Sequence, residues 1–163
     1  MTEEILEILQ RDARLAPGEI ASMLGRKPEE VRREIRRLER EGVILKYKAV
    51  VNREPLGGAA RGVRALIEVK TAPQKDVGFD RVAERIYLFP EVKSCVLLSG
   101  GYDLLLTVEG SDIQGIADFV AQKLAPMEHV RGTVTHFLLK KYKEDGDILV
   151  RGKGKDRRLA VTP

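Results

Sequence analysis

Residues 25–44 read GRKPEEVRREIRRLEREGVI, and this stretch decides the fold of the first part of the chain. Val31, Ile35 and Leu38 recur at the spacing i, i+4 and i+7, which predicts one apolar stripe along a helix. At about 100° per residue, the opposite side of that helix is basic. It carries Arg33, Arg36 and Arg40, with Arg32 and Arg37 on the flanks. One side is therefore suited to pack on a core, and the other to meet a negatively charged partner.

Two shorter apolar-striped helices are predicted before this one. The first spans roughly residues 3–11, and the second and third begin at Pro17 and Pro28, where a missing N–H is tolerated. Gly25 and Gly42 supply the left-handed residues that end them. The inward residues expected in the first two helices are Ile5, Leu6, Ile8, Leu9, Ile20, Ala21 and Leu24. Three helices joined by short turns are the layout of a helix-turn-helix DNA-binding module.

In such a module the N-terminal part of the third helix enters the major groove of double-stranded DNA. The side chains expected at base edges are Lys27, Glu29, Glu30 and Arg33, and those expected to hold phosphates are Arg32, Arg36, Arg40 and Lys46. The following residues 43–52 (VILKYKAVVN) are rich in β-formers and predict a wing or a strand leading out of the module. The alternative is an exposed helix whose arginines are only solvated.

The charge distribution agrees with a polyanionic partner. The formal net charge is only +4, but residues 26–48 hold nine Lys or Arg against five acids, and residues 140–158 hold eight against four. The remainder of the chain is acidic. A basic, polyanion-binding end on a neutral-to-acidic body fits this pattern.

The composition is that of a globular chain with one or two small domains. Its 163 residues are 43% hydrophobic, which is enough to bury a core. The single cysteine, Cys95, excludes an intramolecular disulfide, and the first residues lack the pattern of a signal peptide. No apolar run approaches the ~18–20 residues that span a bilayer. We therefore expect a cytoplasmic protein that does not enter the membrane.

A second domain is predicted after a Pro/Gly-punctuated connector. We expect a DNA-binding module at residues 1–52, a linker at 53–62, a domain at 63–145 and a basic tail at 146–163. The third segment alternates elements in the order strand, helix, strand, strand, helix, strand, at residues 63–71, 77–88, 92–98, 102–108, 113–124 and 129–142. This order predicts a ferredoxin-like βαββαβ unit with an antiparallel sheet and both helices on one face, and hence an α+β protein. The other sheet face, rich in Val, Leu and Ile, predicts self-association.

A candidate ligand site lies in the hairpin signal between the second and third strands. Gly100 and Gly101 fit a turn, whereas Asp103 is a carboxylate at the mouth of an apolar strand, next to Tyr102. Asp103 either caps nearby backbone N–H groups or faces the amine of a small polar ligand at a protomer interface.

No catalytic set, metal site or cofactor is expected from the sequence. His129 and His136 are seven residues apart on one predicted strand, so they fall on opposite faces and make a poor metal pair. Cys95 is expected to be a buried thiol.

The chain resembles the feast/famine (Lrp/AsnC) family of transcription regulators along nearly its whole length. The matching stretches are ILEIL from Ile5, DAR from Asp12, EIA from Glu19, RRLEREGVI from Arg36, YKAVVN from Tyr47, LG from Leu56, LFPEV from Leu88, GGYD from Gly100 and VRGTVT from Val130. The resemblance implies a helix-turn-helix followed by a βαββαβ domain that forms dimers, assembles them into tetramers or octamers and senses small molecules, often amino acids. The family's effector pocket maps onto Gly100, Gly101, Tyr102, Asp103, Thr133 and Thr135.

Two departures from the family pattern leave alternatives open. Lys27 stands where Ser or Thr commonly caps the third helix, and Glu34 replaces a frequent basic residue, which predicts a lost phosphate contact. A sensor without DNA binding is one alternative. Another is an enzyme similar to sirohaem decarboxylases, which share the layout; the stretches SCV at Ser94 and YD at Tyr102 disfavour it. In the tail, residues 152–155 are expected to be solvated, and we hypothesise that the apolar residues 159–161 dock as a strand on a neighbouring protomer.

Overall fold

The computed structural model describes residues 1–52, 62–72 and 79–150. The chain divides into two compact units, Met1–Val51 and Asn52–Pro163. Among the described residues, no helix combines the length and the apolar character needed to cross a bilayer.

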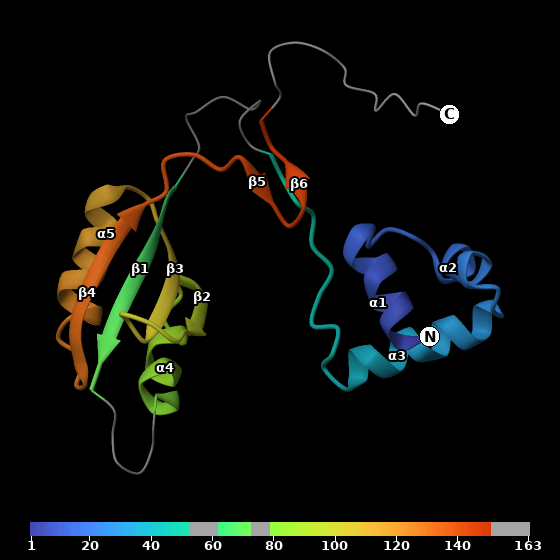
Figure 1. Cartoon of the computed structure of the whole chain (residues 1–163), viewed down its shortest axis with the longest axis horizontal. Helices are drawn as coiled ribbons and strands as arrows, with labels where there is room; N and C mark the ends of the chain where they lie inside the picture. The colour runs from blue at the N-terminus through green and yellow to red at the C-terminus, as the bar shows by residue number, and fades with distance from the viewer. Residues whose placement is uncertain (53–61, 73–78, 151–163) are drawn as a thin grey trace. The chain divides into compact units, whose positions relative to one another are not determined.

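The N-terminal unit consists of the three predicted helices, α1 (Thr2–Arg11), α2 (Pro17–Leu24) and α3 (Pro28–Arg40) (Figure 1). Each proline stands at a first helical position, as expected. Gly25 and Gly42 have φ angles of 61° and 71°, a left-handed conformation that residues with a Cβ rarely adopt. These glycines therefore end α2 and α3 where the sequence predicts.

The three helices enclose a small core. Its buried members are Ile5, Ile20, Ala21, Val31 and Ile35, and Ile8, Leu9, Leu15, Leu24 and Ile44 pack against them. The predicted apolar stripe of α3 is confirmed, because Val31, Ile35 and Leu38 are all buried. The basic side of α3 is left at the surface.

The wing or strand expected over residues 43–52 does not form in the structure. The chain instead folds back at the end of α3, where the N–H groups of Val43 and Ile44 donate to the carbonyl of Leu38. Ile44 joins the core, and the hydroxyl of Tyr47 donates to Glu39 Oε1 at 2.9 Å. A strand needs a backbone partner, and among the described residues none pairs with this segment.

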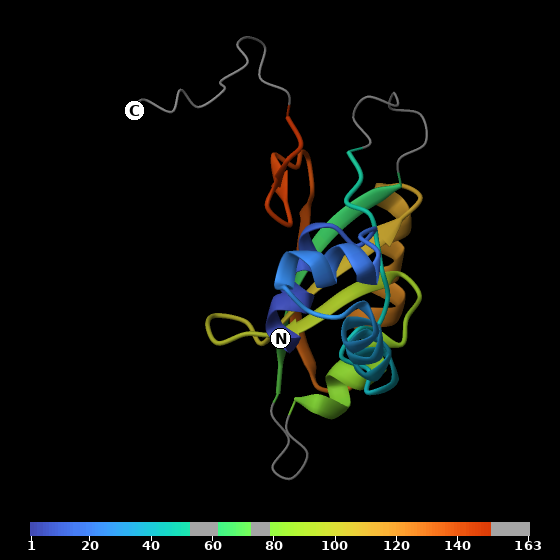
Figure 2. The ribbon, with the colours of Figure 1, turned by 90° about the vertical axis from the view of Figure 1, so that its right-hand side faces the viewer.

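The C-terminal unit confirms the βαββαβ order. The elements are β1 (Val63–Thr71), α4 (Asp80–Tyr87), β2 (Val92–Leu97), β3 (Leu104–Gly110), α5 (Ile113–Phe119), which continues as a π-helical turn η3 (Val120–Leu124), and β4 (Val130–Phe137). The sheet has the order β2-β3-β1-β4 with every pair antiparallel. Both helices cover the same side of this sheet (Figure 2).

Several boundaries differ from those expected. The last strand ends at Phe137 instead of 142, since Phe137 pairs with Ala65 near the start of β1 and little partner strand remains. The third strand begins at Leu104 instead of 102. Beyond β4, the strands β5 (Lys143–Glu144) and β6 (Asp147–Ile148) form a short hairpin across the expected start of the tail at 146.

Parts of the expected organisation lie outside the described residues. They are residues 53–61 of the linker, residues 77–78 of the predicted helix and residues 151–163 of the tail, including the expected docking segment 159–161.

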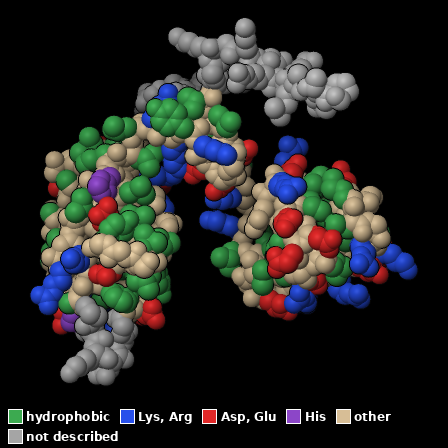
Figure 3. All heavy atoms as spheres, viewed as in Figure 1, with side chains coloured by type: hydrophobic (Ala, Val, Ile, Leu, Met, Phe, Trp, Pro, Cys, Tyr) green, Lys and Arg blue, Asp and Glu red, His purple; other side chains and the backbone are tan. Residues whose placement is uncertain are grey.

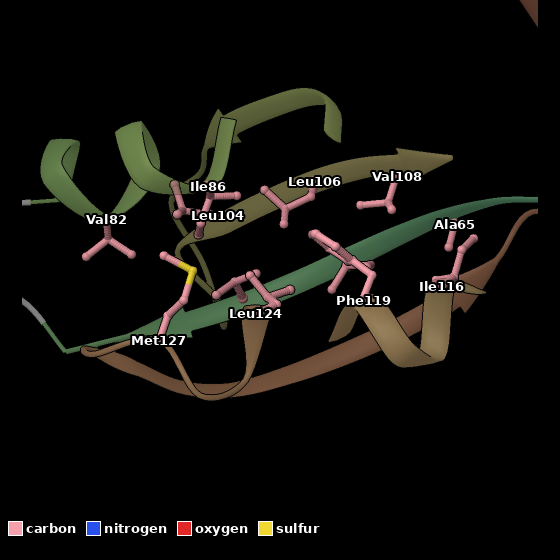
Figure 4. Close-up of a cluster of buried hydrophobic side chains, with 12 residues drawn as sticks. Ala65, Val82, Ile86, Leu104, Leu106, Val108, Ile116, Phe119, Leu124 and Met127 are labelled. Carbon is pink, nitrogen blue, oxygen red and sulfur yellow. The ribbon is translucent and has the colours of Figure 1, made fainter. Parts of the chain in front are cut away.

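The core of the C-terminal unit lies between the sheet and its helices (Figure 4). Alternate residues of β1 and β3 point into it, with Ile67 and Leu106 fully buried as cross-strand partners. Ile86 of α4 and Ile116 of α5 close it from the helix side. The rings of Phe89 and Phe119 meet edge-to-face with centroids 5.5 Å apart.

The open face of the sheet is less uniformly apolar than the sequence predicts. It carries Leu66, Val96, Leu105 and Val134, with Val96 and Val134 exposed by 43% and 52%. Two ion pairs also lie there, between Arg64 and Glu109 and, at 3.0 Å, between His136 Nε2 and Glu68 Oε1. An apolar patch with ion pairs on it is thus left without a partner within the described chain.

Candidate DNA interface and effector site

The exposed side of α3 presents arginines at helical spacing. Arg32, Arg33, Arg36 and Arg40 are all exposed, and within the part of the chain that the structure describes none of them makes an ion pair. Together with Glu29 they line a shallow groove of about 410 Å³. Figure 3 shows basic side chains along the side of the N-terminal unit where α3 lies. Unpaired guanidinium groups in one row are available to phosphates and to guanine edges.

Arg37 differs from the other arginines of α3 because it forms ion pairs with two glutamates of the same unit. Its Nη2 lies 2.7 Å from Glu34 Oε1 and its Nη1 lies 2.6 Å from Glu41 Oε2. Arg37 therefore stabilises the helix, and it lies on the flank of α3 where the sequence predicts it.

Glu34 has a structural role that the sequence analysis missed. The hydroxyl of Thr2 donates to Glu34 Oε1 at 2.6 Å, which ties the first turn of α1 to the middle of α3. Hydrogen bonds from Arg37 and Thr2 lower the pKa of Glu34 from its usual 4.5 to about 2. The loss of a phosphate contact at Glu34 stays a prediction; in the structure this side chain bonds to Thr2 of α1 and does not line the groove. The sequence offers one sign of this structural role, the i, i+3 spacing of Glu34 and Arg37, which allows an ion pair on a helix.

The two lysines of the expected interface lie at its ends. Lys27 is the N-cap residue of α3, with the extended backbone of a cap (φ −84°, ψ 138°) but no capping hydrogen bond from its side chain. The missing cap expected from the sequence is therefore confirmed. Lys46 is exposed in the segment after α3, and Glu30 is half-buried in the first turn of α3 and does not line the groove.

Asp103 is held at the end of β1. Its Oδ2 accepts from the backbone N–H of Thr71 at 2.6 Å and from the Thr71 hydroxyl at 3.1 Å. Its own N–H donates to the carbonyl of Val69 at 3.0 Å. Thr71 is only 6% exposed, so Asp103 satisfies a buried N–H of a neighbouring strand instead of the turn's own groups. Among the described residues Oδ1 of Asp103 has no hydrogen-bond partner.

Gly100, Gly101, Tyr102 and Thr133 lie toward the Asp103 end of the sheet, whereas Thr135 lies opposite the middle of β1. Gly100 and Gly101 are exposed in the β2–β3 loop, Tyr102 is half-buried, and Gly100 has a φ of 152°. Thr133 is the cross-strand partner of Val69, the residue whose other side meets Asp103, and Thr135 pairs with Ile67. The contact between Thr71 and Asp103 was not predicted from the sequence. It depends on the register between β1 and β3, which brings the two residues together.

The histidines and the cysteine are separated. His129 precedes β4 with a φ of 73°, whereas His136 is on the open face of the sheet. Cys95 is half-buried against the core, and burial raises the pKa of its thiol. No group of three or more His, Cys, Asp or Glu side chains is placed to hold a metal ion anywhere in the described residues.

Two family profiles match the two units. The winged helix-turn-helix DNA-binding profile matches residues 2–44, and the profile of the Lrp/AsnC ligand binding domain matches residues 64–148. The matched ranges contain the basic face of α3 and the whole βαββαβ fold with its β2–β3 loop.

Curated relatives and solved structures agree with these profiles. The HTH-type transcriptional regulator YugG of Bacillus subtilis is 45% identical over 98% of this chain and 95% of its own length. The regulator FL11 of Pyrococcus furiosus is 30% identical over 91% and 94%. The structure of the regulator NMB0573 of Neisseria meningitidis, a complex with L-Met, superposes with a TM-score of 0.68 at 29% identity and covers 88% of this chain and 90% of that one. The chain therefore belongs to the Lrp/AsnC family of transcriptional regulators, with a DNA-binding helix-turn-helix and a ligand-binding domain.

Proposed function

We propose that this regulator binds double-stranded operator DNA through α3 and that an amino acid bound to its C-terminal unit changes the affinity for that DNA. The observation that carries the proposal is the groove lined by Arg32, Arg33, Arg36 and Arg40, whose charges have no partner in the described chain. Sequence-specific binding requires side chains at base edges as well as on phosphates.

We assign the side chains of this surface to two roles, contacts with base edges and contacts with phosphates. Glu29 and Arg33 lie in the N-terminal half, which enters the major groove in a helix-turn-helix, with Lys27 and Glu30 beside them. Arg32 lies beside Arg33 in the same half of α3, Arg36 and Arg40 follow further along, and Lys46 lies after the helix; we assign these four to phosphates. Each phosphate contact makes binding more sensitive to salt.

The effector site is proposed at the end of the sheet where Asp103, which follows the β2–β3 loop, bonds to the end of β1. The exposed Gly100 and Gly101 bring backbone N–H groups within reach of a ligand carboxylate, and the free Oδ1 of Asp103 suits a ligand ammonium. Tyr102, Thr133 and Thr135 are proposed to line the same pocket. The L-Met complex of NMB0573 supports the choice of an amino acid.

Self-association belongs to the same proposal. A second copy would cover the open sheet face with its own, which gives a homodimer, and dimers would combine into a tetramer or octamer. As a regulator of transcription, the protein would act in the cytoplasm without a catalytic step or cofactor.

Fluorescence anisotropy tests the function directly. The purified protein is titrated onto labelled DNA from upstream of its own gene, with and without a pooled amino-acid mixture, over a series of salt concentrations. We expect affinity that falls steeply with salt and shifts with the pool, and splitting the pool then names the effector. Binding indifferent to every amino acid would remove the effector half of the proposal, and no binding at any salt would remove the DNA half.

A further inference from the structure

The groove on α3 contains one carboxylate among its arginines. Of its five lining residues Glu29 alone is acidic, and it is exposed. Arg32, Arg33, Arg36 and Arg40 follow it at i+3, i+4, i+7 and i+11, so at about 100° per residue Glu29 lies within the arc that they occupy. Its neighbour Glu30 is half-buried and does not line the groove. Glu29 thus points where the DNA is proposed to bind.

Glu29 does not neutralise the arginines around it. Among the described residues it makes no ion pair, in contrast to Glu34 and Glu41, which both hold Arg37. A carboxylate on the first turn is favourable for the helix, but that effect does not require it to face the groove. Facing DNA, its charge is repelled by the phosphates, and a hydrogen bond accepted from a base would offset that cost. Its position therefore favours base recognition.

The major groove offers two amino groups as donors, N4 of cytosine and N6 of adenine. The N6 group of adenine stands beside the acceptor N7, which repels a carboxylate, whereas cytosine shows only its N4 donor there. We propose that Glu29 determines specificity by accepting a hydrogen bond from cytosine N4, so that each operator half-site carries a C·G pair at a fixed position. This inference rests on the proposed DNA binding through α3.

Arg33 extends the same recognition by one turn of α3. It lies about 6 Å further along the helix axis than Glu29, a distance of one to two base-pair steps of ~3.4 Å. Its unpaired guanidinium matches the two acceptors of guanine, O6 and N7. We therefore expect each half-site to carry a cytosine read by Glu29 and, one to two base pairs away, a guanine read by Arg33.

The experiment selects duplexes with a random core on the full-length protein and compares wild type with Glu29→Ala and Glu29→Gln. Wild type should fix a cytosine at one position of each half-site, and Glu29→Ala should lower that preference about tenfold while the other positions keep theirs. Glu29→Gln should move the preference toward adenine, whose N6 and N7 match a side-chain amide. The matched control is Glu7→Ala, which removes an exposed carboxylate from α1 and should leave every preference unchanged.

The outcomes separate the inference from the function on which it rests. If Glu29→Ala binds DNA and selects the same base at every position as wild type, the assignment of Glu29 to cytosine is overturned and the DNA-binding proposal stands. If wild type enriches no sequence and binds none of the duplexes, both proposals fall together. Circular dichroism of each variant establishes that α3 remains folded.

Discussion

The hydroxyl of Thr2 and the carboxylate of Glu34 are joined by a 2.6 Å hydrogen bond that fixes the start of α1 against the middle of α3. Because Arg37 donates to the same carboxylate, the three side chains form a small network away from the exposed row of arginines. An ionised Glu34 thus links α1 to α3 in addition to the apolar core that the helices share.

This network predicts a pH dependence of stability. The pKa of Glu34 is about 2 in the folded protein, below its usual 4.5, so its stabilising effect is complete above about pH 4.5 and is lost as the pH falls toward 2. Glu34→Gln should be less stable than wild type at pH 7, and the difference should shrink in acid. Urea unfolding followed by circular dichroism between pH 7 and 2 measures this. A constant difference across that range would contradict the role given to the charge.

Removing one arginine from the exposed row should weaken DNA binding in a salt-dependent way. For Arg36→Ala we expect the slope of log K against log salt to fall by about 0.9, the value for one lost phosphate contact. The matched control is Arg81→Ala, which removes an exposed arginine from α4 in the other unit. Anisotropy titrations at several salt concentrations make the comparison, and equal slopes for the two variants would argue against the groove as the interface.

Asp103 should have separable structural and ligand-binding roles. In Asp103→Ala the buried N–H of Thr71 loses its acceptor, which should lower the free energy of unfolding by about 1–3 kcal/mol. Asp103→Asn keeps an acceptor oxygen but loses the charge, so it should remain more stable than the alanine variant and still fail to respond to amino acids. Urea unfolding and anisotropy with the amino-acid pool give the two readouts. A normal response in Asp103→Asn would contradict the proposal that the charge of Asp103 is needed to bind a ligand ammonium.

The open sheet face should tolerate a new charge poorly if it is the dimer interface. Val134→Glu places a carboxylate close to Glu68 on that face and should convert dimers to monomers. Leu88→Glu, at a residue 72% exposed beside α4, should leave the dimer intact. Light scattering coupled to size-exclusion chromatography gives the mass of each variant, and an unchanged mass for Val134→Glu would place the interface elsewhere.

The uncapped start of α3 offers a stabilising substitution. Lys27 already has the extended backbone of an N-cap, so Lys27→Ser should accept a hydrogen bond from the first turn and raise the free energy of unfolding by about 1 kcal/mol. Lys27→Ala is the control and should give no such gain. If the Lys27→Ser and Lys27→Ala variants have the same free energy of unfolding in urea, the serine does not cap α3.

The sequence predicted those elements whose ends are marked by particular residues. The prolines and glycines around α2 and α3 give their limits, and the alternation of β1 gives its full range from Val63 to Thr71. The predicted end of a strand was wrong where it depends on a distant partner. For example, β4 stops near the point where β1 ceases to pair with it. The strand expected after α3 lacks a partner altogether among the described residues.

Side-chain roles were harder to predict because they depend on how elements meet. The arginine row follows from helical periodicity alone, and the structure places it at the surface as expected. The bonds from Thr71 to Asp103 and from Thr2 to Glu34 each join residues 32 positions apart. Strand register and helix packing create such pairs, and neither is encoded in a local pattern.

The pairing of β1 with β4 has a consequence for the order in which the protein forms during translation. The N-terminal unit is complete after Val51, whereas β1 pairs with β3 on one side and its second neighbour, β4, begins only at Val130. At ~5–20 residues per second the ribosome needs roughly 3–12 seconds to add the chain between Thr71, where β1 ends, and Val130. Domains generally fold N-terminal first during synthesis, and non-local pairing is slow. We therefore expect the DNA-binding half to fold on the nascent chain before synthesis of the ligand-binding half is complete.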